Sequence, residues 1–127
     1  MGLSYIHDLR VALAAIRAVG EQIAGLARMR GAGWRVELVK SRLQMAQALD
    51  LFSTLLARSE AAAALPARDL TELREAASRF RTALAIHQAK FAAASIEASE
   101  AYDKSAGEVW NAGENFRETA ERILSRA

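Results

Sequence analysis

The chain has no cysteine, a single proline and only 6% aromatic residues among its 127 residues. The absence of cysteine excludes disulfide bonds and thiolate metal sites. Few β-branched residues and almost no proline, beside abundant alanine, favour helices over sheets. No apolar run approaches the roughly 20 residues that cross a bilayer, and the N-terminus lacks the basic start of a secretory signal. We therefore expect a soluble, cytoplasmic protein.

Composition and length predict one folded domain. Hydrophobic residues make up 52% of the chain and charged residues 25%, which is typical of a globular protein rather than a disordered one. A chain of this length buries roughly two-thirds of its unfolded surface. We expect residues 1–127 to form a single helical-bundle domain. The formal net charge of +2 is too small to indicate nucleic-acid binding by itself.

Apolar residues three and four positions apart predict two long helices in the first half of the chain. The first should run from about residue 4 to residue 30, with Ser4 as its N-cap. The sequence Gly31-Ala32-Gly33 should end it, because glycine adopts the left-handed geometry of a helix end at little cost. The second should run from Trp34 to about Ser59. Such a short link predicts an antiparallel hairpin.

The second half contains one or two further helices. Pro66 interrupts helical hydrogen bonding, so residues 60–66 should be a frayed extension or a loop. Residues 69–72 resemble a capping box that opens a third helix, whose apolar stripe runs from Leu73 through Phe91 to Tyr102. A second capping box at residues 105–108 favours a break and a fourth helix. We therefore predict an all-α antiparallel bundle of four helices. The alternative is three helices, the last a rod of about 57 residues and about 85 Å.

His87 lies on the stripe of the third helix, with Lys90 one turn later. This H-x-x-K spacing resembles the core of histidine phosphotransfer domains, which are small helical bundles. There the histidine carries a phosphoryl group and the lysine offsets its charge. Phe91 stands where that family has a glycine, which puts the docking of a receiver domain in doubt. A phosphorylated histidine must also be exposed, whereas the stripe predicts partial burial. The other interpretation is a packed, hydrogen-bonded histidine.

Metal and catalytic signatures are missing from the sequence. Di-iron bundles need a glutamate three residues before each histidine ligand. In this chain Ser4 stands three residues before His7, and Leu84 three residues before His87. The chain contains no phosphate-binding glycine loop, no nucleophile elbow and no dinucleotide glycine fingerprint. We therefore predict no enzymatic activity, no metal and no cofactor.

The link between the first two helices is a candidate binding site. Arg28, Arg30, Trp34 and Arg35 lie on or beside the turn, and residues 28–42 together carry a net charge of +4. Such a tip suits nucleic-acid phosphates, acidic lipid headgroups or an acidic protein groove. The structural alternative is that the arginines complement the helix dipole while Trp34 closes the end of the core.

The C-terminal segment has the opposite charge. Between residues 97 and 127, seven acidic and four basic residues leave a balance of −3. With the basic tip this makes the molecule electrically polar, which favours self-association, although such charges also occur on solvated helix faces. Trp110, Phe116 and Ile123 form either a ridge that faces a partner or part of the core.

Two segments carry a resemblance to a known family. They are residues 37–43 (ELVKSRL) and residues 73–84 (LREAASRFRTAL). With the order of two long helices, a short turn and an alanine-rich third helix, they resemble flagellar export chaperones of the FlgN type. The resemblance implies that an amphipathic C-terminal helix binds the helical ends of secreted partners. Here that helix would cover residues 102–123, with Tyr102, Trp110 and Phe116 as candidate contacts.

The sequence therefore predicts a non-catalytic helical binding protein, acting as an adaptor, chaperone or scaffold. Its partner would be a protein, with an amphipathic helix as one possibility, and the chain itself could form a homo-oligomer. One alternative is a phosphotransfer module that uses His87 and Lys90. Another is a protein that binds nucleic acid or an acidic membrane surface through the hairpin tip.

Overall fold

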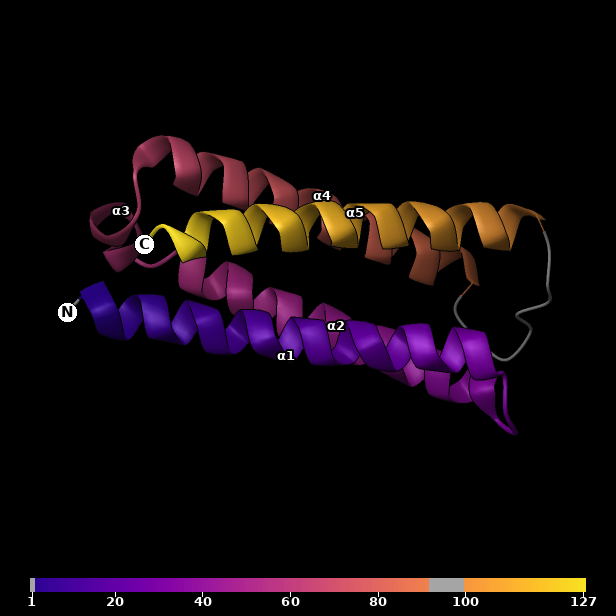
Figure 1. Ribbon diagram of the computed structural model, residues 1–127. Helices are drawn as coiled ribbons and strands as arrows, with labels where there is room; N and C mark the ends of the chain where they lie inside the picture. The colour runs from indigo at the N-terminus through magenta and orange to yellow at the C-terminus, as the bar shows by residue number, and fades with distance from the viewer. Residues whose placement is uncertain (1, 92–99) are drawn as a thin grey trace.

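The computed structural model describes residues 2–91 and 100–127, and these residues form helices and no strands. The helices are α1 (Gly2–Met29), α2 (Trp34–Leu56), α3 (Glu60–Ala64), α4 (Ala67–Phe91) and α5 (Glu100–Ser125). Four of them are long, and α3 is a short helix between α2 and α4 (Figure 1). The predicted all-α class is confirmed. None of the described helices is both long and apolar enough to cross a membrane.

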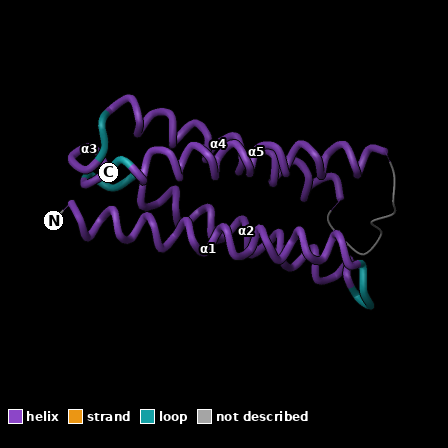
Figure 2. The backbone as a smooth tube through the Cα atoms, viewed as in Figure 1, coloured by secondary structure: helices purple, strands orange, loops and turns teal. Residues whose placement is uncertain are grey.

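The long helices pack most closely in two pairs. One pair is α1 with α2, and the other is α4 with α5. In each pair the chain direction reverses, and the first pair is joined by the tight turn at one end of the molecule (Figures 1 and 2). The hairpin predicted from the glycine-containing link is therefore confirmed. The rod formed by one continuous last helix is wrong, because α5 folds back and packs along α4.

Helix boundaries differ from the prediction where capping motifs were used to place them. Ser4 lies inside α1, which begins at Gly2. Asp69 lies in the first turn of α4 rather than before it, because the carbonyl of Pro66 accepts the first helical hydrogen bond, from Leu70 at 2.9 Å. Proline has a φ angle that is compatible with a helix. It lacks a backbone N–H, but an N–H at the start of a helix has no partner within the helix, so proline is well suited to this position.

Ser105 was also predicted to begin a helix, and this prediction is wrong. It lies in the second turn of α5, it is buried, and its hydroxyl contacts His87. At the other predicted boundary, α2 ends at Leu56, earlier than expected, and residues 60–64 form α3.

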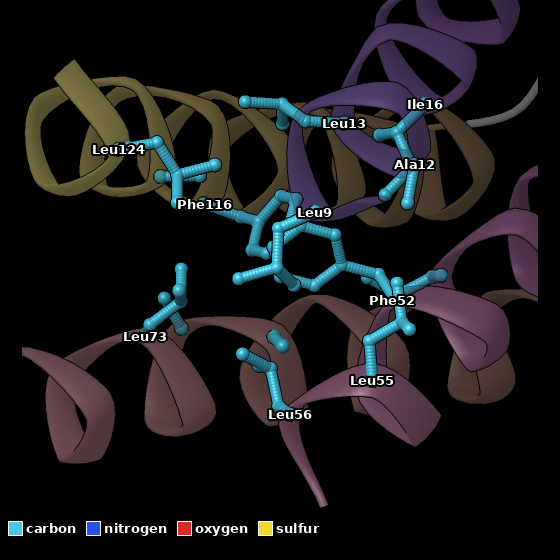
Figure 3. Close-up of a cluster of buried hydrophobic side chains, with 14 of the residues drawn as sticks. Leu9, Ala12, Leu13, Ile16, Phe52, Leu55, Leu56, Leu73, Phe116 and Leu124 are labelled. Carbon is cyan, nitrogen blue, oxygen red and sulfur yellow. The ribbon is translucent and has the colours of Figure 1, made fainter. Parts of the chain in front are cut away.

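Large apolar side chains from all four long helices meet in one core. Leu9, Phe52, Leu73 and Phe116 are fully buried at its centre (Figure 3). The rings of Phe52 and Phe116 meet edge to face with centroids 5.2 Å apart, a favoured aromatic geometry. The residues of the predicted α4 stripe are buried from Leu73 to His87. The rest of that stripe, from Phe91 to Ala101, lies outside the side chains that the structure describes.

Polar contacts fix the first half of α1 to the end of α5. Arg10 donates from Nη2 to the carbonyl of Leu124 at 2.8 Å. About two turns further along α1, Arg17 pairs with Glu121 at 3.3 Å. Toward the α1–α2 turn, α1 and α5 diverge (Figure 1).

Candidate functional site

A groove of about 490 Å³ opens where α1 and α5 diverge. Its size is in the usual range for ligand-binding clefts. Small residues make much of its walls: Gly20, Ala24 and Ala27 on α1, and Ala106, Gly107 and Gly113 on α5. Met45 of α2 and Phe80 and Leu84 of α4 line its base. Side chains of both charges surround it: Arg17, Glu21, Glu114 and Arg117.

The glycines show where the groove is open and where it is closed. A Cβ atom on Gly107 would meet no atom within 4 Å. A Cβ atom on Gly113 would lie 3.0 Å from Cζ of Phe80, closer than real Cβ contacts normally come. The α5 backbone therefore packs against the Phe80 ring at Gly113, and the space lies one to two turns earlier, at Gly107.

The three candidate residues of the C-terminal ridge are separated by the fold. Trp110 lines the groove and is 48% exposed. Phe116 and Ile123 are fully buried in the core, so a ridge that includes them is wrong. Among these three side chains, Trp110 is the one placed to touch a partner.

A polar cluster is buried where α2, α4 and α5 meet. Arg42 donates from Nη1 to the hydroxyl of Tyr102 at 2.7 Å, and its guanidinium lies 5.6 Å from the centre of that ring. The Nδ1 atom of His87 and the hydroxyl of Ser105 form a hydrogen bond of 2.9 Å. The His87 and Tyr102 rings lie 5.2 Å apart. Tyr102, predicted as a contact for a partner, is therefore buried and engaged within the protein.

The surroundings of His87 keep its imidazole neutral. Burial, together with the charge of Arg42, lowers the pKa of His87 from 6.5 to about 4. Its side chain is only 2% exposed, whereas Lys90 is on the surface. Accepting a phosphoryl group requires an accessible imidazole nitrogen, and this conformation does not offer one. The geometry is that of a packed, hydrogen-bonded histidine.

Arg42 also lines the groove, although it was counted with the charges of the hairpin tip. It is almost fully buried, and within the described part of the chain no carboxylate lies at ion-pair distance from its guanidinium. A buried charge without a counter-charge is unfavourable. The lining of the groove therefore includes one buried positive charge, which is hydrogen-bonded to Tyr102.

The hairpin tip, residues 28–36, brings its predicted residues together. The guanidinium groups of Arg30 and Arg35 lie 5.1 and 5.2 Å from the centre of the Trp34 ring, at cation–π distance. Trp34 is half-buried and is not part of the apolar core, so the prediction that it closes the core is wrong. Met29 beside it is 79% exposed.

Searches against known proteins found no match: no protein-family model fits the chain, and neither a curated protein nor a solved structure is similar to it. Metal ligands are likewise not gathered, since the described residues contain no cluster of three or more potential ligands. The groove is the candidate site that sequence analysis missed. Its traces in the sequence are small residues, Gly20, Ala24 and Ala27 on one wall and Ala106, Gly107 and Gly113 on the other.

Proposed function

We propose that the protein is a non-catalytic binding protein that takes an amphipathic helix of a protein partner into the groove between α1 and α5. In this proposal the four long helices act as an antiparallel bundle that is complete at the termini and open toward the hairpin tip. The partner helix completes the bundle, as expected of an adaptor, chaperone or scaffold. The observation that carries the proposal is the apolar groove itself.

The dimensions and composition of the groove suit a helix. Its α1 wall runs from Ile16 to Ala27 and its α5 wall from Ala106 to Arg117. At 1.5 Å per residue each wall is about 17 Å long, or about three helical turns. Small side chains on both walls let a helix backbone approach closely. The exposed Trp110 and the charged residues around an apolar base are the usual anatomy of a protein interface.

The Arg42 guanidinium specifies one property of the partner helix. An aspartate or glutamate on the inserted face of that helix would pair with Arg42, which has no ion-pair partner among the residues that the structure describes. Replacing Arg42 by glutamine should then weaken binding about tenfold or more, and replacing the acidic residue of the partner by its amide should have the same effect. If the two changes act independently when combined, the acidic residue does not contact Arg42.

Filling the groove tests the proposal. Gly107→Leu places a side chain where no atom lies within 4 Å, so the variant should fold and block the groove. Gly25→Leu is the matched control, because Gly25 also has no neighbour within 4 Å, lies inside α1 and does not line the groove. Both variants gain helix propensity, so a difference between them reports groove access.

The readout is photo-crosslinking from position 110 in a lysate, followed by mass spectrometry. We expect one protein partner to be crosslinked by the parent protein and by Gly25→Leu, and to be lost with Gly107→Leu. Nuclease treatment should leave the product unchanged. Equal crosslinking of that partner by Gly107→Leu would show that the groove is not its binding site.

Several expectations from the sequence stay predictions. They are the cytoplasmic location, the absence of catalysis and cofactors, the homo-oligomer and the likeness to FlgN-type chaperones. The groove is compatible with the last of these, because a chaperone of that kind also receives helices. The partner helix in our proposal would contact α1 as well as α5, whereas the resemblance implies contacts through the C-terminal helix.

A further inference from the structure

We propose that the hairpin tip, residues 28–36, is a second binding site and that it docks on the anionic headgroups of a lipid bilayer. This inference depends on residues at the α1–α2 turn and is independent of the groove. The tip lies at the opposite end of the molecule from both termini (Figure 1). It can therefore meet a flat surface without obstruction by the chain ends.

Uncompensated positive charge is the first observation. Arg28, Arg30 and Arg35 are exposed, and within the described ranges no carboxylate lies at ion-pair distance from any of them. The nearby Glu37 pairs with Lys40 at 3.6 Å, so these two charges offset each other. Three guanidinium groups at one end of the molecule attract an anionic surface, and each contributes separately to the attraction.

Exposed apolar groups within the same nine residues are the second observation. Met29 is 79% exposed and Val36 is 55% exposed, although both are large apolar side chains. Trp34 lies between them in the sequence and is half-buried. Tryptophan and arginine are suited to the headgroup region, because each has an apolar body and a polar end. Met29 and Val36 would enter the outer part of the acyl region.

The arrangement of Trp34 favours lipid over nucleic acid. Proteins that bind single strands stack bases on open aromatic faces. Here two guanidinium groups already lie over the Trp34 ring. Contacts to nucleic-acid phosphates alone would also leave the apolar side chains of Met29 and Val36 exposed to water. A lipid surface uses all of these groups together.

The backbone of the turn adds a third observation. Arg30 has φ of 46°, in the left-handed region where glycine is favoured, and its Nε atom donates to the carbonyl of Ala27 at 3.2 Å. An arginine is thus held in a conformation that disfavours it, with its guanidinium over Trp34. A left-handed residue directly after Met29 ends α1, and here it also places the Arg30 guanidinium beside Trp34.

The experiment is co-sedimentation of the full chain with vesicles at physiological salt. Vesicles of phosphatidylcholine with about one-third phosphatidylserine should bind the protein, and pure phosphatidylcholine vesicles should not. In the triple variant Arg28→Gln, Arg30→Gln, Arg35→Gln, binding should weaken about 100-fold, since each cation contributes a similar factor. The matched control is Arg58→Gln, Arg68→Gln, Arg79→Gln, which removes the same charge from exposed positions elsewhere and should bind like the parent protein.

A second measurement separates insertion from simple charge attraction. In a Trp110→Phe background, Trp34 is the remaining tryptophan, and its emission should shift to the blue on binding of the anionic vesicles. Adding Met29→Ser should weaken binding further. The proposal is overturned if both triple variants bind equally, if Trp34 emission does not shift, or if the tip binds duplex RNA and not vesicles.

Discussion

Two glycines of α5 provide the sharpest test of how this helix is seated. Gly107 and Gly113 both lie inside the helix, where alanine is favoured over glycine by about 0.8–1.0 kcal/mol. If only helix propensity mattered, Gly107→Ala and Gly113→Ala would stabilise the protein equally. Their surroundings differ, however, and the difference sets opposite expectations for the two changes.

For Gly107→Ala we expect the whole gain in stability from helix propensity. The new Cβ atom would meet nothing within 4 Å, so no neighbour has to move. We expect the free energy of unfolding to rise by about 0.8–1.0 kcal/mol. For a chain of this length that corresponds to an increase in Tm of about 4 °C.

For Gly113→Ala the gain in stability from helix propensity should be cancelled or reversed by a steric clash. The new Cβ atom would lie 3.0 and 3.1 Å from Cζ and Cε1 of Phe80. Phe80 is buried, and its ring lies 5.9 Å from the fully buried Phe116 ring, which limits its movement in that direction. Overpacking of this kind costs about 1–3 kcal/mol, so the net change should lie between zero and a loss of about 2 kcal/mol.

Urea denaturation followed by far-ultraviolet circular dichroism measures both changes, provided that the m-values stay equal. The variants should differ by about 1–3 kcal/mol, with Gly107→Ala the more stable. An equal gain in both would refute the close contact of α5 with Phe80. A loss at Gly107 would refute the open groove at that position.

Three further predictions concern the core, the buried histidine and the end of α2. Phe116→Ala removes a fully buried ring and should lower the free energy of unfolding by about 3–5 kcal/mol in urea; a loss below 1 kcal/mol would contradict its central position. Because the pKa of His87 is lowered from 6.5 to about 4, folding favours the neutral ring, and the associated stability is complete above pH 6.5 and lost as the pH falls toward 4. The loss should reach about 3 kcal/mol, and His87→Leu should abolish that part of the pH dependence; an unchanged profile would place the titration elsewhere. Arg74 donates from Nε and Nη2 to the carbonyl of Leu56 at 3.1 and 2.6 Å, so Arg74→Met should cost about 1–2 kcal/mol in thermal denaturation, and no change would mean that water replaces the contact.

The sequence predicts the helices of this protein better than their ends. The apolar period places α1 and α2 correctly because the same stripe that indicates a helix is the one buried in the core, as with Leu9 and Phe52. Capping motifs predict the helix starts incorrectly, because other local interactions decide where the helices begin. The serine of the supposed capping box at Ser105 is a buried partner of His87. At Asp69 the motif lies within one turn of Pro66, which starts the helix.

The groove could not be predicted because it depends on an angle between helices that are distant in the sequence. Small residues such as Gly20 and Gly107 are compatible both with tight packing and with an open space. Which of these occurs is decided by where α1 leaves α5, beyond Arg17 and Glu121. By contrast, a core position for Phe116 was one of the two interpretations of the sequence, and Phe116 is fully buried. Trp110, which the sequence grouped with it, stays half-exposed.

The polar cluster around Arg42 has a consequence for the alignment of the helices. A shift by one helical turn moves a helix about 5.4 Å along its axis. Such a shift of α5 would move the Tyr102 hydroxyl and the Ser105 hydroxyl away from Arg42 and His87 together. A buried guanidinium would then lose its acceptor, which is strongly unfavourable. Four polar side chains thus oppose a change of register among three helices, in addition to the apolar contacts of the core.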